Sequence, residues 1–319
     1  MRILVTGGCG YKGSVLVPLL LADGHEVVSV DTQWFGNHLP QHPKLTNLKL
    51  DIRDTDAIPL NGVEAIIHLA NIANDPAVEL NPTLSWEVNV LAGQQLADRA
   101  VRAGVRQFIF ASSGSVYGVK EESNVTEDLT LVPISVYNKT KMVAERVFLS
   151  YQDQMQVHCI RPATVCGVSP RMRLDVSVNM LSYQALKNGR ITVFGGDQTR
   201  PNIHIQDIVD VYRHFLAHPE IPSGCYNAGF ENISILDIAE RVKNEIDAEI
   251  VVSASNDPRS YRQDSSKLLG TGFQPSHSVA DAISEIAEAF NKDALPDDDS
   301  CYTVKWMRRL DLAAPELNA

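Results

Sequence analysis

The stretch RILVTGGCGYKG, residues 2–13, decides how the fold of this 319-residue chain begins. Its first five residues, Arg2–Thr6, form a short apolar run that is typical of a buried strand. The chain then turns through several glycines and continues as an apolar segment, Gly13 to Ala22, whose pattern predicts a helix. A strand, a glycine-rich turn and a helix in this order predict the start of a layered α/β domain.

The glycines of the turn, Gly7, Gly10 and Gly13, stand at a spacing that suits a bound dinucleotide. They allow, respectively, a tight bend, a close approach of the backbone to a pyrophosphate, and close packing of the helix on the strand. The helix N-terminus then faces the phosphates. The pattern also fits an ordinary turn, but its place between a strand and a helix favours the dinucleotide site. Lys12, within the turn, either reaches a cofactor phosphate or lies on the surface.

Strands and helices alternate along the first half of the chain. Helices are predicted from the N-cap Asn81, which precedes Pro82, to about Gly104, and from Ser135 to Tyr151. Further apolar runs predict strands at Glu26–Val30, Leu48–Leu50, Ala65–Leu69, Gln107–Ala111 and Val157–Ile160. This alternation predicts a doubly wound parallel Rossmann sheet of six or seven strands.

The sequence changes in character beyond Gly167, where short helical patterns, prolines and isolated arginines replace the regular alternation. We therefore expect an α/β protein of two parts, a dinucleotide-binding Rossmann domain over residues 1–165 and a smaller mixed substrate-binding domain over 166–292. Part of 203–229 is expected to return to the main sheet. The tail, 293–319, is either an exposed extension or a subunit contact.

Composition and charge exclude several classes of partner. The formal net charge of −11 repels nucleic acid and anionic lipid, so we expect neither as a partner. No apolar stretch is long enough to span a membrane, and the first apolar run lacks the cleavage pattern of a signal peptide. The five cysteines contain no C-x-x-C pair and indicate neither a disulfide framework nor a zinc site. These features favour a cytoplasmic protein without a metal.

Asp31 ends the second predicted strand, roughly 20 residues beyond the glycine turn. At that place a carboxylate accepts hydrogen bonds from the ribose hydroxyls of adenosine. Thr32 and Gln33 follow it, whereas an arginine is expected there in a chain that binds the 2′-phosphate of NADP. The position therefore favours NAD as the cofactor. The alternative is that Asp31 only caps a turn.

Tyr137 and Lys141 begin and end the sequence YNKTK, near the start of a predicted helix. Four residues apart, they lie one turn from each other on the same helix face. The usual tyrosine pKa of about 10 is too high for a base at neutral pH, but a neighbouring ammonium lowers it. The pair is then a usable general base. Because such pairs are also common on solvated helix surfaces, the assignment depends on the residues around them.

A hydroxyl-rich segment, SSGSVYG at Ser112–Gly118, follows the strand that ends at Ala111. It is expected at the carboxyl edge of the sheet, where folds of this kind bind ligands, with Ser113 holding the reacting hydroxyl of the substrate. Together with TGGCGYKG, YNKTK and HLAN at His68–Asn71, the segment resembles the extended short-chain dehydrogenase/reductase family. The resemblance covers nearly the whole chain.

Within that family, the chain resembles the nucleotide-sugar epimerases and dehydratases. RPNIHIQD at Arg200–Asp207 and PRSYRQD at Pro258–Asp264 are similar to their substrate-domain signatures. The resemblance implies a nucleotide-diphosphate sugar as substrate and three catalytic residues, Tyr137, Lys141 and Ser113. The residues that it places at the NAD site are Gly7, Gly10, Tyr11, Lys12, Gly13, Asp31, Asp51, Ile52, Leu69, Ala70, Asn71, Ser112, Tyr137, Lys141 and Pro162. Those that it places at the substrate are Ser113, Ser115, Thr164, Asn179, Arg200, Arg259 and Arg262.

Two further expectations follow from the resemblance. Arg200, Arg259 and Arg262 are expected to clamp the sugar diphosphate, although each taken singly also fits a surface ion pair. The family often forms dimers through two helices of the sheet domain. A homodimer is therefore expected here, through the helices near Leu84–Ala103 and Ser135–Tyr151.

The chain also departs from the family pattern at the site. Family dehydratases usually carry Asp-Glu after the active serine or threonine, whereas Gly114 and Ser115 stand here, which disfavours sugar 4,6-dehydration. Thr164 occupies a place where 4-epimerases of the UDP-galactose type have asparagine. Strict equivalence to those epimerases is therefore not expected.

Several functions fit these residues. The leading hypothesis is oxidation at C4 of the sugar through a 4-keto species, which makes an epimerase if the hydride returns to the other face. If the keto sugar leaves, the enzyme is a net 4-dehydrogenase, and run in reverse with NADH it is a 4-ketoreductase. A non-catalytic dinucleotide-binding regulator, or a protein that uses the fold only for assembly, is the alternative from another class, since a Rossmann domain alone does not imply chemistry.

Overall fold

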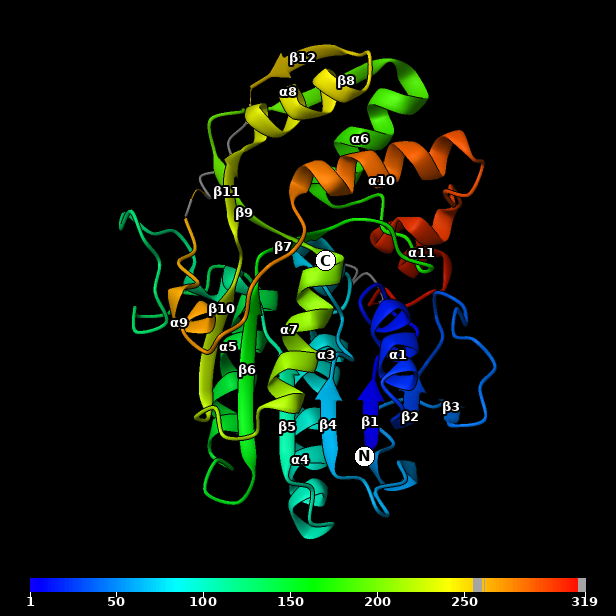
Figure 1. Ribbon diagram of the computed structural model, residues 1–319, viewed down its shortest axis with the longest axis vertical. Helices are drawn as coiled ribbons and strands as arrows, with labels where there is room; N and C mark the ends of the chain where they lie inside the picture. Colours follow the sequence, from blue (N-terminus) through cyan, green and yellow to red (C-terminus); the bar gives the residue numbers. More distant parts are fainter. Residues whose placement is uncertain (255–259, 261, 315–319) are drawn as a thin grey trace.

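The computed structural model describes residues 1–254, 260 and 262–314. A parallel sheet of seven strands forms the lower body in Figure 1, in the order β10-β6-β5-β4-β1-β2-β3. The strands are β1 (Arg2–Thr6), β2 (Glu26–Asp31), β3 (Leu45–Lys49), β4 (Ala65–His68), β5 (Gln107–Ala111), β6 (Gln156–Pro162) and β10 (Gly224–Ala228). The chain crosses from one side of β1 to the other after β3, as in doubly wound folds, which confirms the predicted Rossmann sheet.

All neighbouring strands of this sheet run parallel, so their carboxyl ends meet at one edge. β1 and β5 have the predicted bounds. The strand expected at Leu48–Leu50 spans Leu45–Lys49 instead, and that prediction was wrong by a few residues. β3 is an edge strand whose side chains are partly or fully exposed, so it lacks the continuous apolar run that marks the central strands.

Helices cover both faces of the sheet. They are α1 (Gly13–Ala22), α2 (Asp75–Leu80), α3 (Pro82–Trp86), α4 (Ala92–Arg102), α5 (Val136–Leu149) and α7 (Ile205–Ala217). On one face α1 and α7 bury Leu16 and Phe215, and on the other α4 and α5 bury Leu96 and Phe148. Each such side chain contributes about 1.5–3 kcal/mol. These two apolar layers fix the strand ends that carry the site. None of the helices in the described ranges is both long and apolar enough to cross a bilayer.

The helix predicted from Asn81 to Gly104 is present, but it is not uniform. Asn81 caps it by accepting a hydrogen bond from a backbone N–H of the first turn at 3.0 Å, as expected. A π-helical turn, Glu87–Leu91, separates α3 from α4. Asn89 in this turn is buried and bonds the backbone N–H and C=O of Ile72 at 2.8 and 3.2 Å. The π turn therefore anchors the loop after β4, and neither this turn nor α2 was predicted.

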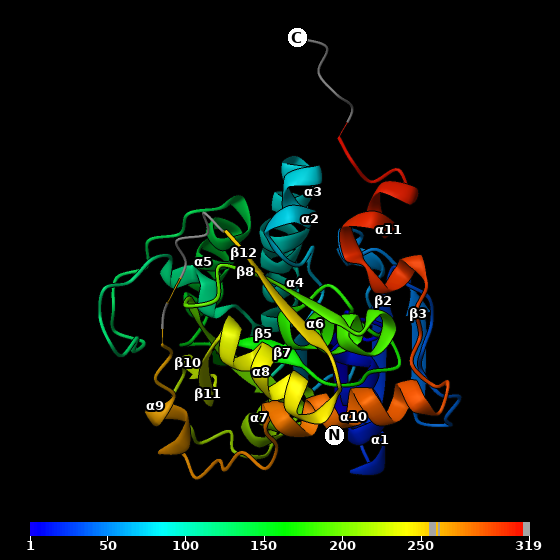
Figure 2. The ribbon, with the colours of Figure 1, turned by 90° about the horizontal axis from the view of Figure 1, so that it is seen from above.

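A smaller lobe stands above the carboxyl ends of the strands, and Figure 2 looks down onto it. Helices α6, α8 and α10 pack around the parallel pair β8 and β12, with a core that includes Ile191, Val242 and Ile283. A mixed sheet of order β11-β9-β7 forms the base of the lobe. The elements of this part are β7 (Thr164–Cys166), α6 (Ser177–Asn188), β8 (Arg190–Phe194), β9 (Thr199–His204), β11 (Glu231–Ser234), α8 (Ile235–Glu245), β12 (Glu249–Ser253) and α10 (Val279–Asn291). Two further helices, α9 (Ser266–Leu269) and α11 (Thr303–Arg309), pack on the main body, α9 beside β10 and α11 against α2.

The last described part of the chain, residues 299–314, returns to the main body. Its helix, α11, lies above the carboxyl ends of β1 and β2 in Figure 1. The indole N–H of Trp306 donates a hydrogen bond to the carbonyl of Trp34 at 2.5 Å. The backbone N–H of Ala314 donates to the carbonyl of Leu80 at 2.8 Å. The segment is thus attached both to the loop after β2 and to the end of α2.

Candidate active site

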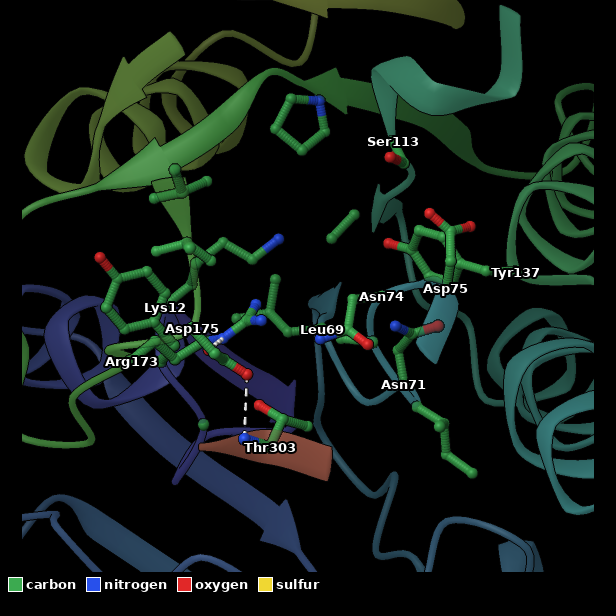
Figure 3. Close-up of a pocket in the computed structure, with 18 of the residues that line it drawn as sticks. Lys12, Leu69, Asn71, Asn74, Asp75, Ser113, Tyr137, Arg173, Asp175 and Thr303 are labelled. Atoms are coloured by element: carbon green, nitrogen blue, oxygen red, sulfur yellow. Dashed lines mark hydrogen bonds and ion pairs between the residues drawn. The ribbon is translucent and has the colours of Figure 1, made fainter. Parts of the chain in front are cut away.

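A cavity of about 650 Å³ lies between the carboxyl edge of the main sheet and the smaller lobe. In Figure 3, Ser113 and Tyr137 lie on one side of it, and Lys12 and Arg173 lie on the other. Every residue predicted at the NAD site lines this cavity: Gly7, Gly10, Tyr11, Lys12, Gly13, Asp31, Asp51, Ile52, Leu69, Ala70, Asn71, Ser112, Tyr137, Lys141 and Pro162. The predicted substrate residues that line it are Ser113, Ser115, Thr164 and Arg200.

The remaining predicted substrate residues are not among the cavity lining. Asn179 is fully buried, and its amide bonds the backbone N–H of Gly167 and the hydroxyl of Tyr11, each at 3.0 Å. Arg262 is exposed and does not line the cavity. Arg259 lies outside the described residues. The structure therefore does not bring Asn179 or Arg262 to the cavity wall, and their contact with a substrate stays a prediction.

The glycines of the first turn serve two different purposes. A Cβ at Gly7 would stand 2.7 Å from the backbone nitrogen of Ala70, and one at Gly13 would stand 2.3 Å from the carbonyl oxygen of Gly7. Both positions are therefore closed to any side chain by the packing of the turn. A Cβ at Gly10 would meet only the carbonyl oxygen of Gly7, at 3.2 Å. The space beside Gly10, next to the N-terminus of α1, is open to a phosphate group.

Two carboxylates stand at the far end of the cavity, after β2 and β3. Asp31 accepts hydrogen bonds from the backbone N–H groups of Cys9 at 3.0 Å and Gln33 at 2.6 Å, and burial raises its pKa. Asp51 pairs with Arg53 at 2.9 Å. Each carboxylate oxygen has two lone pairs, so the oxygens of Asp31 retain acceptor capacity for ribose hydroxyls. The two bonds hold the Asp31 carboxylate in one orientation at this end of the cavity.

A chain of hydroxyls runs from the end of β5 to α5. Ser115 donates to the side-chain oxygen of Asn138 at 2.6 Å, and the hydroxyls of Ser113 and Ser115 are 2.8 Å apart. Since the one proton of Ser115 is directed at Asn138, Ser113 is the donor to Ser115. A substrate oxygen in the cavity would compete for that proton. Ser113 is thus a hydroxyl donor whose proton rotates by a single torsion to a ligand.

Lys141 lies one helical turn beyond Tyr137, and both face the cavity. Its ammonium donates to the carbonyl of Ala111 at 2.7 Å and stands 4.6 Å from the ring centre of Phe110 and 6.0 Å from that of Tyr137. Burial, followed by the charge of Lys12, holds the pKa of Lys141 well below its ordinary value. An anion in the cavity would restore the charged form. We call the following four residues the hydroxyl side of the cavity: Ser113, Ser115, Tyr137 and Lys141.

A buried ion pair supports the hydroxyl side from behind. Arg161 on β6 donates to both carboxylate oxygens of Glu145 on α5, at 2.9 and 2.8 Å, and the two side chains are 4% and 1% exposed. Ser112 donates to the same carboxylate at 2.5 Å, and Arg161 also bonds the hydroxyl of Tyr117 at 2.7 Å. This network ties the loop after β5 to β6 and α5. It therefore fixes the segments that carry Ser113 and Tyr137.

The opposite wall holds cations that sequence reasoning mostly missed. Lys12, Arg171 and Arg173 all line the cavity, and only Lys12 was considered for the cofactor. Arg173 donates to Asp175 at 2.8 Å, and Asp175 in turn accepts from the backbone N–H of Thr303 at 2.9 Å. The arginines come from the irregular loop between β7 and α6, so only their charge, not any periodicity, marked them in the sequence. We call Lys12, Arg171 and Arg173 the cationic side.

Asp75 is a third site residue that the sequence analysis missed. It lines the cavity and accepts a hydrogen bond from the hydroxyl of Ser135, and Figure 3 shows it on the same side as Tyr137. Asn74, at φ +75°, caps the short helix α2 by accepting from Ala77 at 2.9 Å and so presents Asp75 to the cavity. Because α2 was not predicted, no sequence pattern placed this carboxylate at the site.

The lining fits an anionic dinucleotide. The glycine backbone of the first turn lies beside the N-terminus of α1, and the acidic acceptors are Asp31, which ends β2, and Asp51, which follows β3. Several cations also line the cavity. The side-chain oxygen of Asn71 is buried in this lining with no hydrogen-bond partner, so it has acceptor capacity for a donor on a ligand. Within the part of the chain that the structure describes, no group of three or more His, Cys, Asp or Glu side chains is placed to hold a metal ion.

Comparison with known proteins gives extensive matches. A profile described as the NAD dependent epimerase/dehydratase family matches residues 3–229. A UDP-glucose 4-epimerase of Mycolicibacterium smegmatis is 32% identical over 317 residues, covering 91% of this chain and 98% of its own. One of Lactobacillus helveticus is 27% identical over 321 residues, covering 92% and 97%. A crystal structure of the UDP-glucuronic acid 4-epimerase of Bacillus cereus, in complex with UDP-glucuronic acid and NAD, matches with a TM-score of 0.79 and 26% identity, over 92% of this chain and 99% of that one.

Proposed function

The chain belongs to the NAD dependent epimerase/dehydratase family, and from this membership we propose that it is a nucleotide-sugar 4-epimerase. In this proposal the enzyme oxidises C4 of a nucleotide-diphosphate sugar to a ketone and reduces the ketone from its other face. The two bacterial UDP-glucose 4-epimerases and the Bacillus cereus UDP-glucuronic acid 4-epimerase, which the chain resembles over nine-tenths of its length, support this reaction class.

One observation carries the proposal. Tyr137, Lys141 and Ser113 line the same cavity as the glycine turn, although they come from separate parts of the chain. A regulator that only binds a dinucleotide has no need of a tyrosine, an ammonium and a serine hydroxyl at the substrate end. The hydroxyl side therefore supports an enzyme rather than a binding protein.

The chemistry of the hydroxyl side follows from its proton donors and acceptors. Tyr137 takes the proton of the sugar 4-hydroxyl, and a charged Lys141 nearby stabilises its phenolate. Ser113 turns its hydroxyl from Ser115 to the sugar oxygen and stabilises the partial charge that develops there. NAD, when bound, accepts the hydride from C4 and returns it. Reprotonation of the sugar oxygen by Tyr137 then completes a cycle with no net redox change.

Thr164 favours a second candidate, a net 4-dehydrogenase. It lines the cavity at a place where 4-epimerases of the UDP-galactose type carry asparagine, so strict equivalence to those epimerases is not expected. If the keto sugar leaves before it is reduced, the same residues yield one NADH for each sugar oxidised. The hydride chemistry is common to both candidates, and they differ only in the fate of the ketone.

The two candidates are separated by following sugar and cofactor together. The purified enzyme is incubated with UDP-, GDP- and dTDP-linked hexoses, the products are resolved by ion-exchange chromatography and NMR, and NADH is followed by absorbance. An inverted C4 centre without accumulated NADH supports the epimerase, whereas a keto sugar with stoichiometric NADH supports the dehydrogenase. Absence of any conversion by the native enzyme, with the dinucleotide bound, would contradict both.

The assembly state that we propose is a homodimer formed through the helices on one face of the sheet. Trp86 and Leu91 are large apolar side chains that stay 38% and 53% exposed on the segment that joins α3 to α4. Exposed apolar side chains on one helical segment favour a partner surface. Light scattering coupled to gel filtration tests this, and a Leu91→Glu variant is expected to shift a dimer toward monomer.

A further inference from the structure

Arg171 is a buried cation with no carboxylate in ion-pair contact among the described residues, although the charge of Asp175 acts on it from a greater distance. Only 5% of it is exposed, it lines the cavity, and no carboxylate of the described residues stands within ion-pair distance of its guanidinium. Its side-chain hydrogen bonds are long, at 3.4 Å to the carbonyl of Met172 and 3.4 Å to the hydroxyl of Thr303. Removing a guanidinium from water without a partner is unfavourable. The position is therefore suited to an anion from outside the chain.

The surroundings of Arg171 place this anion site at the cofactor half of the cavity. The guanidinium lies 4.0 Å from the ring centre of Phe35, in the loop that follows β2 and Asp31. Arg173 and Lys12 line the same wall, and Lys12 belongs to the glycine turn itself. Burial and the charge of Arg173 lower the pKa of Lys12 to about 8 and that of Arg171 to about 10. Three cations thus act on one another with one carboxylate, Asp175, among them, and a dianionic group would relieve the remaining repulsion.

The pyrophosphate of NAD is the anion that this position fits best. Lys12 and the open side of Gly10 stand where the helix N-terminus faces a pyrophosphate. A 2′-phosphate is disfavoured because Asp31, already a carboxylate, stands at the adenosine ribose position. The diphosphate of the sugar substrate is the other source of the same chemistry, and Arg200 on β9 is the lining cation nearer to the smaller lobe.

The C-terminal segment, residues 299–314, covers this group of cations. Thr303 and Met307 of the segment line the cavity. The hydroxyl of Thr303 accepts from Arg171, and its backbone N–H donates to Asp175, which holds Arg173. Bonds to the loop after β2 and to the end of α2, described above, fasten the segment on both sides. A ligand pyrophosphate at the cationic side would therefore lie beneath a strap of chain.

We propose that Arg171, with Arg173 and Lys12, clamps the pyrophosphate of NAD, and that residues 299–314 close this clamp so that NAD stays bound between turnovers. The inference rests on the NAD site of the proposed function and deepens it. A cofactor that does not leave suits an enzyme that returns its hydride to the substrate, as an epimerase does. A dehydrogenase needs its cofactor to exchange.

The test measures cofactor release without any sugar substrate. Native enzyme is purified, its dinucleotide content is measured by mass after denaturation, and the release rate is followed by exchange with excess isotope-labelled NAD. Arg171→Met is expected to release NAD about 10–100-fold faster than the wild type, since it removes a charge-assisted contact. Arg171→Lys keeps the charge but loses the two parallel N–H donors of the guanidinium. Its rate of NAD release is expected to lie between those of the wild type and Arg171→Met.

Controls separate the clamp from a general effect of losing an arginine. Arg106→Met makes the same chemical change at an exposed arginine, 70% exposed, which precedes β5 at the opposite edge of the sheet. It should release NAD at the wild-type rate. Thr303→Ala leaves Arg171 in place and removes only its contact to the strap, so a severalfold faster release is expected. If Arg171→Met does not fold, Arg171→Lys and Thr303→Ala carry the test.

Several outcomes would overturn the proposal. Wild-type release by folded Arg171→Met, or by both Arg171→Lys and Thr303→Ala, would show that the clamp does not hold the pyrophosphate. Unchanged NAD release with weakened binding of a nucleotide sugar would assign Arg171 to the substrate diphosphate instead. Slow release from an enzyme that converts no nucleotide sugar would leave the clamp standing and reject the proposed function, so the two failures are distinguishable.

Discussion

The hydroxyl side and the cationic side face the same cavity, but the chain builds them differently. The hydroxyl side comes from the end of β5 and one turn of α5, is tied together by short hydrogen bonds, and rests on a buried ion pair. The cationic side is collected from the glycine turn and a distant irregular loop, and one of its members, Arg171, has only long hydrogen bonds within the described residues beside its contact with the Phe35 ring. The hydroxyls of Ser113 and Ser115 are bonded within the protein, whereas the cationic side favours an anion from outside it. We infer that the hydroxyl side performs chemistry and the cationic side holds the cofactor.

The Tyr137→Phe variant is expected to give the largest effect, a loss of turnover without a loss of bound NAD. The change removes one hydroxyl from the hydroxyl side, and loss of general acid–base catalysis lowers kcat by about 10²–10⁴-fold. NAD content, measured by mass after denaturation, is expected to equal that of the wild type because the cationic side is unaltered. Full turnover by this variant, or loss of its NAD, would break the division of labour.

Support beneath the hydroxyl side is tested by Glu145→Gln. It leaves the buried Arg161 without its countercharge, and a loss of about 3–5 kcal/mol in the free energy of unfolding is expected from urea titration. The matched control is Glu64→Gln, whose partner Arg106 is exposed and for which at most about 1 kcal/mol is expected. Equal losses at the two positions would mean that the buried network is not what stabilises this wall.

Ser113→Ala tests the donor that is expected at the sugar oxygen. Because Ser113 contributes most when charge develops on that oxygen, kcat should fall by about 10²-fold with little change in KM. Ser115→Ala, which removes the group that Ser113 donates to and its bond to Asn138 but leaves Ser113 in place, should cost less. A larger effect at Ser115 than at Ser113 would reverse the order of the hydroxyl chain.

The smallest effect is expected from the pH dependence of NAD binding. The pKa of Lys12 is lowered to about 8, by burial first, so its positive charge is present below pH 8 and is lost above it. A bound diphosphate raises this pKa, so NAD affinity should be constant below pH 8 and fall by at most about tenfold per pH unit above it. Calorimetry of cofactor-stripped enzyme measures this. Lys12→Arg, which stays charged, should abolish the step, and an unchanged step would assign it to another group.

The same contrast explains what the sequence could predict. The main sheet and the hydroxyl side follow from apolar runs and from motifs in which Tyr137 and Lys141, or the glycines, are a few residues apart. Such local spacing survives folding because one strand or one helix carries the whole motif. The parallel sheet, expected with six or seven strands, and the cavity-lining glycines, Tyr137 and Lys141 were accordingly predicted from these patterns.

Residues brought together by tertiary structure left no such signal. Arg171 and Arg173 lie in a loop without periodicity, and Thr303 reaches them only because the C-terminal segment folds back over β1 and β2. Asp75 was missed because α2 is a short helix whose start depends on the left-handed backbone of Asn74. The family resemblance implied that Asn179 contacts the substrate, but its amide bonds the protein and it does not line the cavity wall.

The central claim, that a retained cofactor carries a hydride from C4 and back, is tested most directly with a nucleotide sugar deuterated at C4. The sugar that the enzyme converts is incubated with catalytic amounts of enzyme and excess unlabelled NAD in solution, and the product is analysed by NMR and mass. We predict inversion at C4 with the deuterium still at C4 and none in the dissolved cofactor. Transfer of deuterium to dissolved NADH, or its loss to water, would contradict a closed hydride cycle on a bound cofactor.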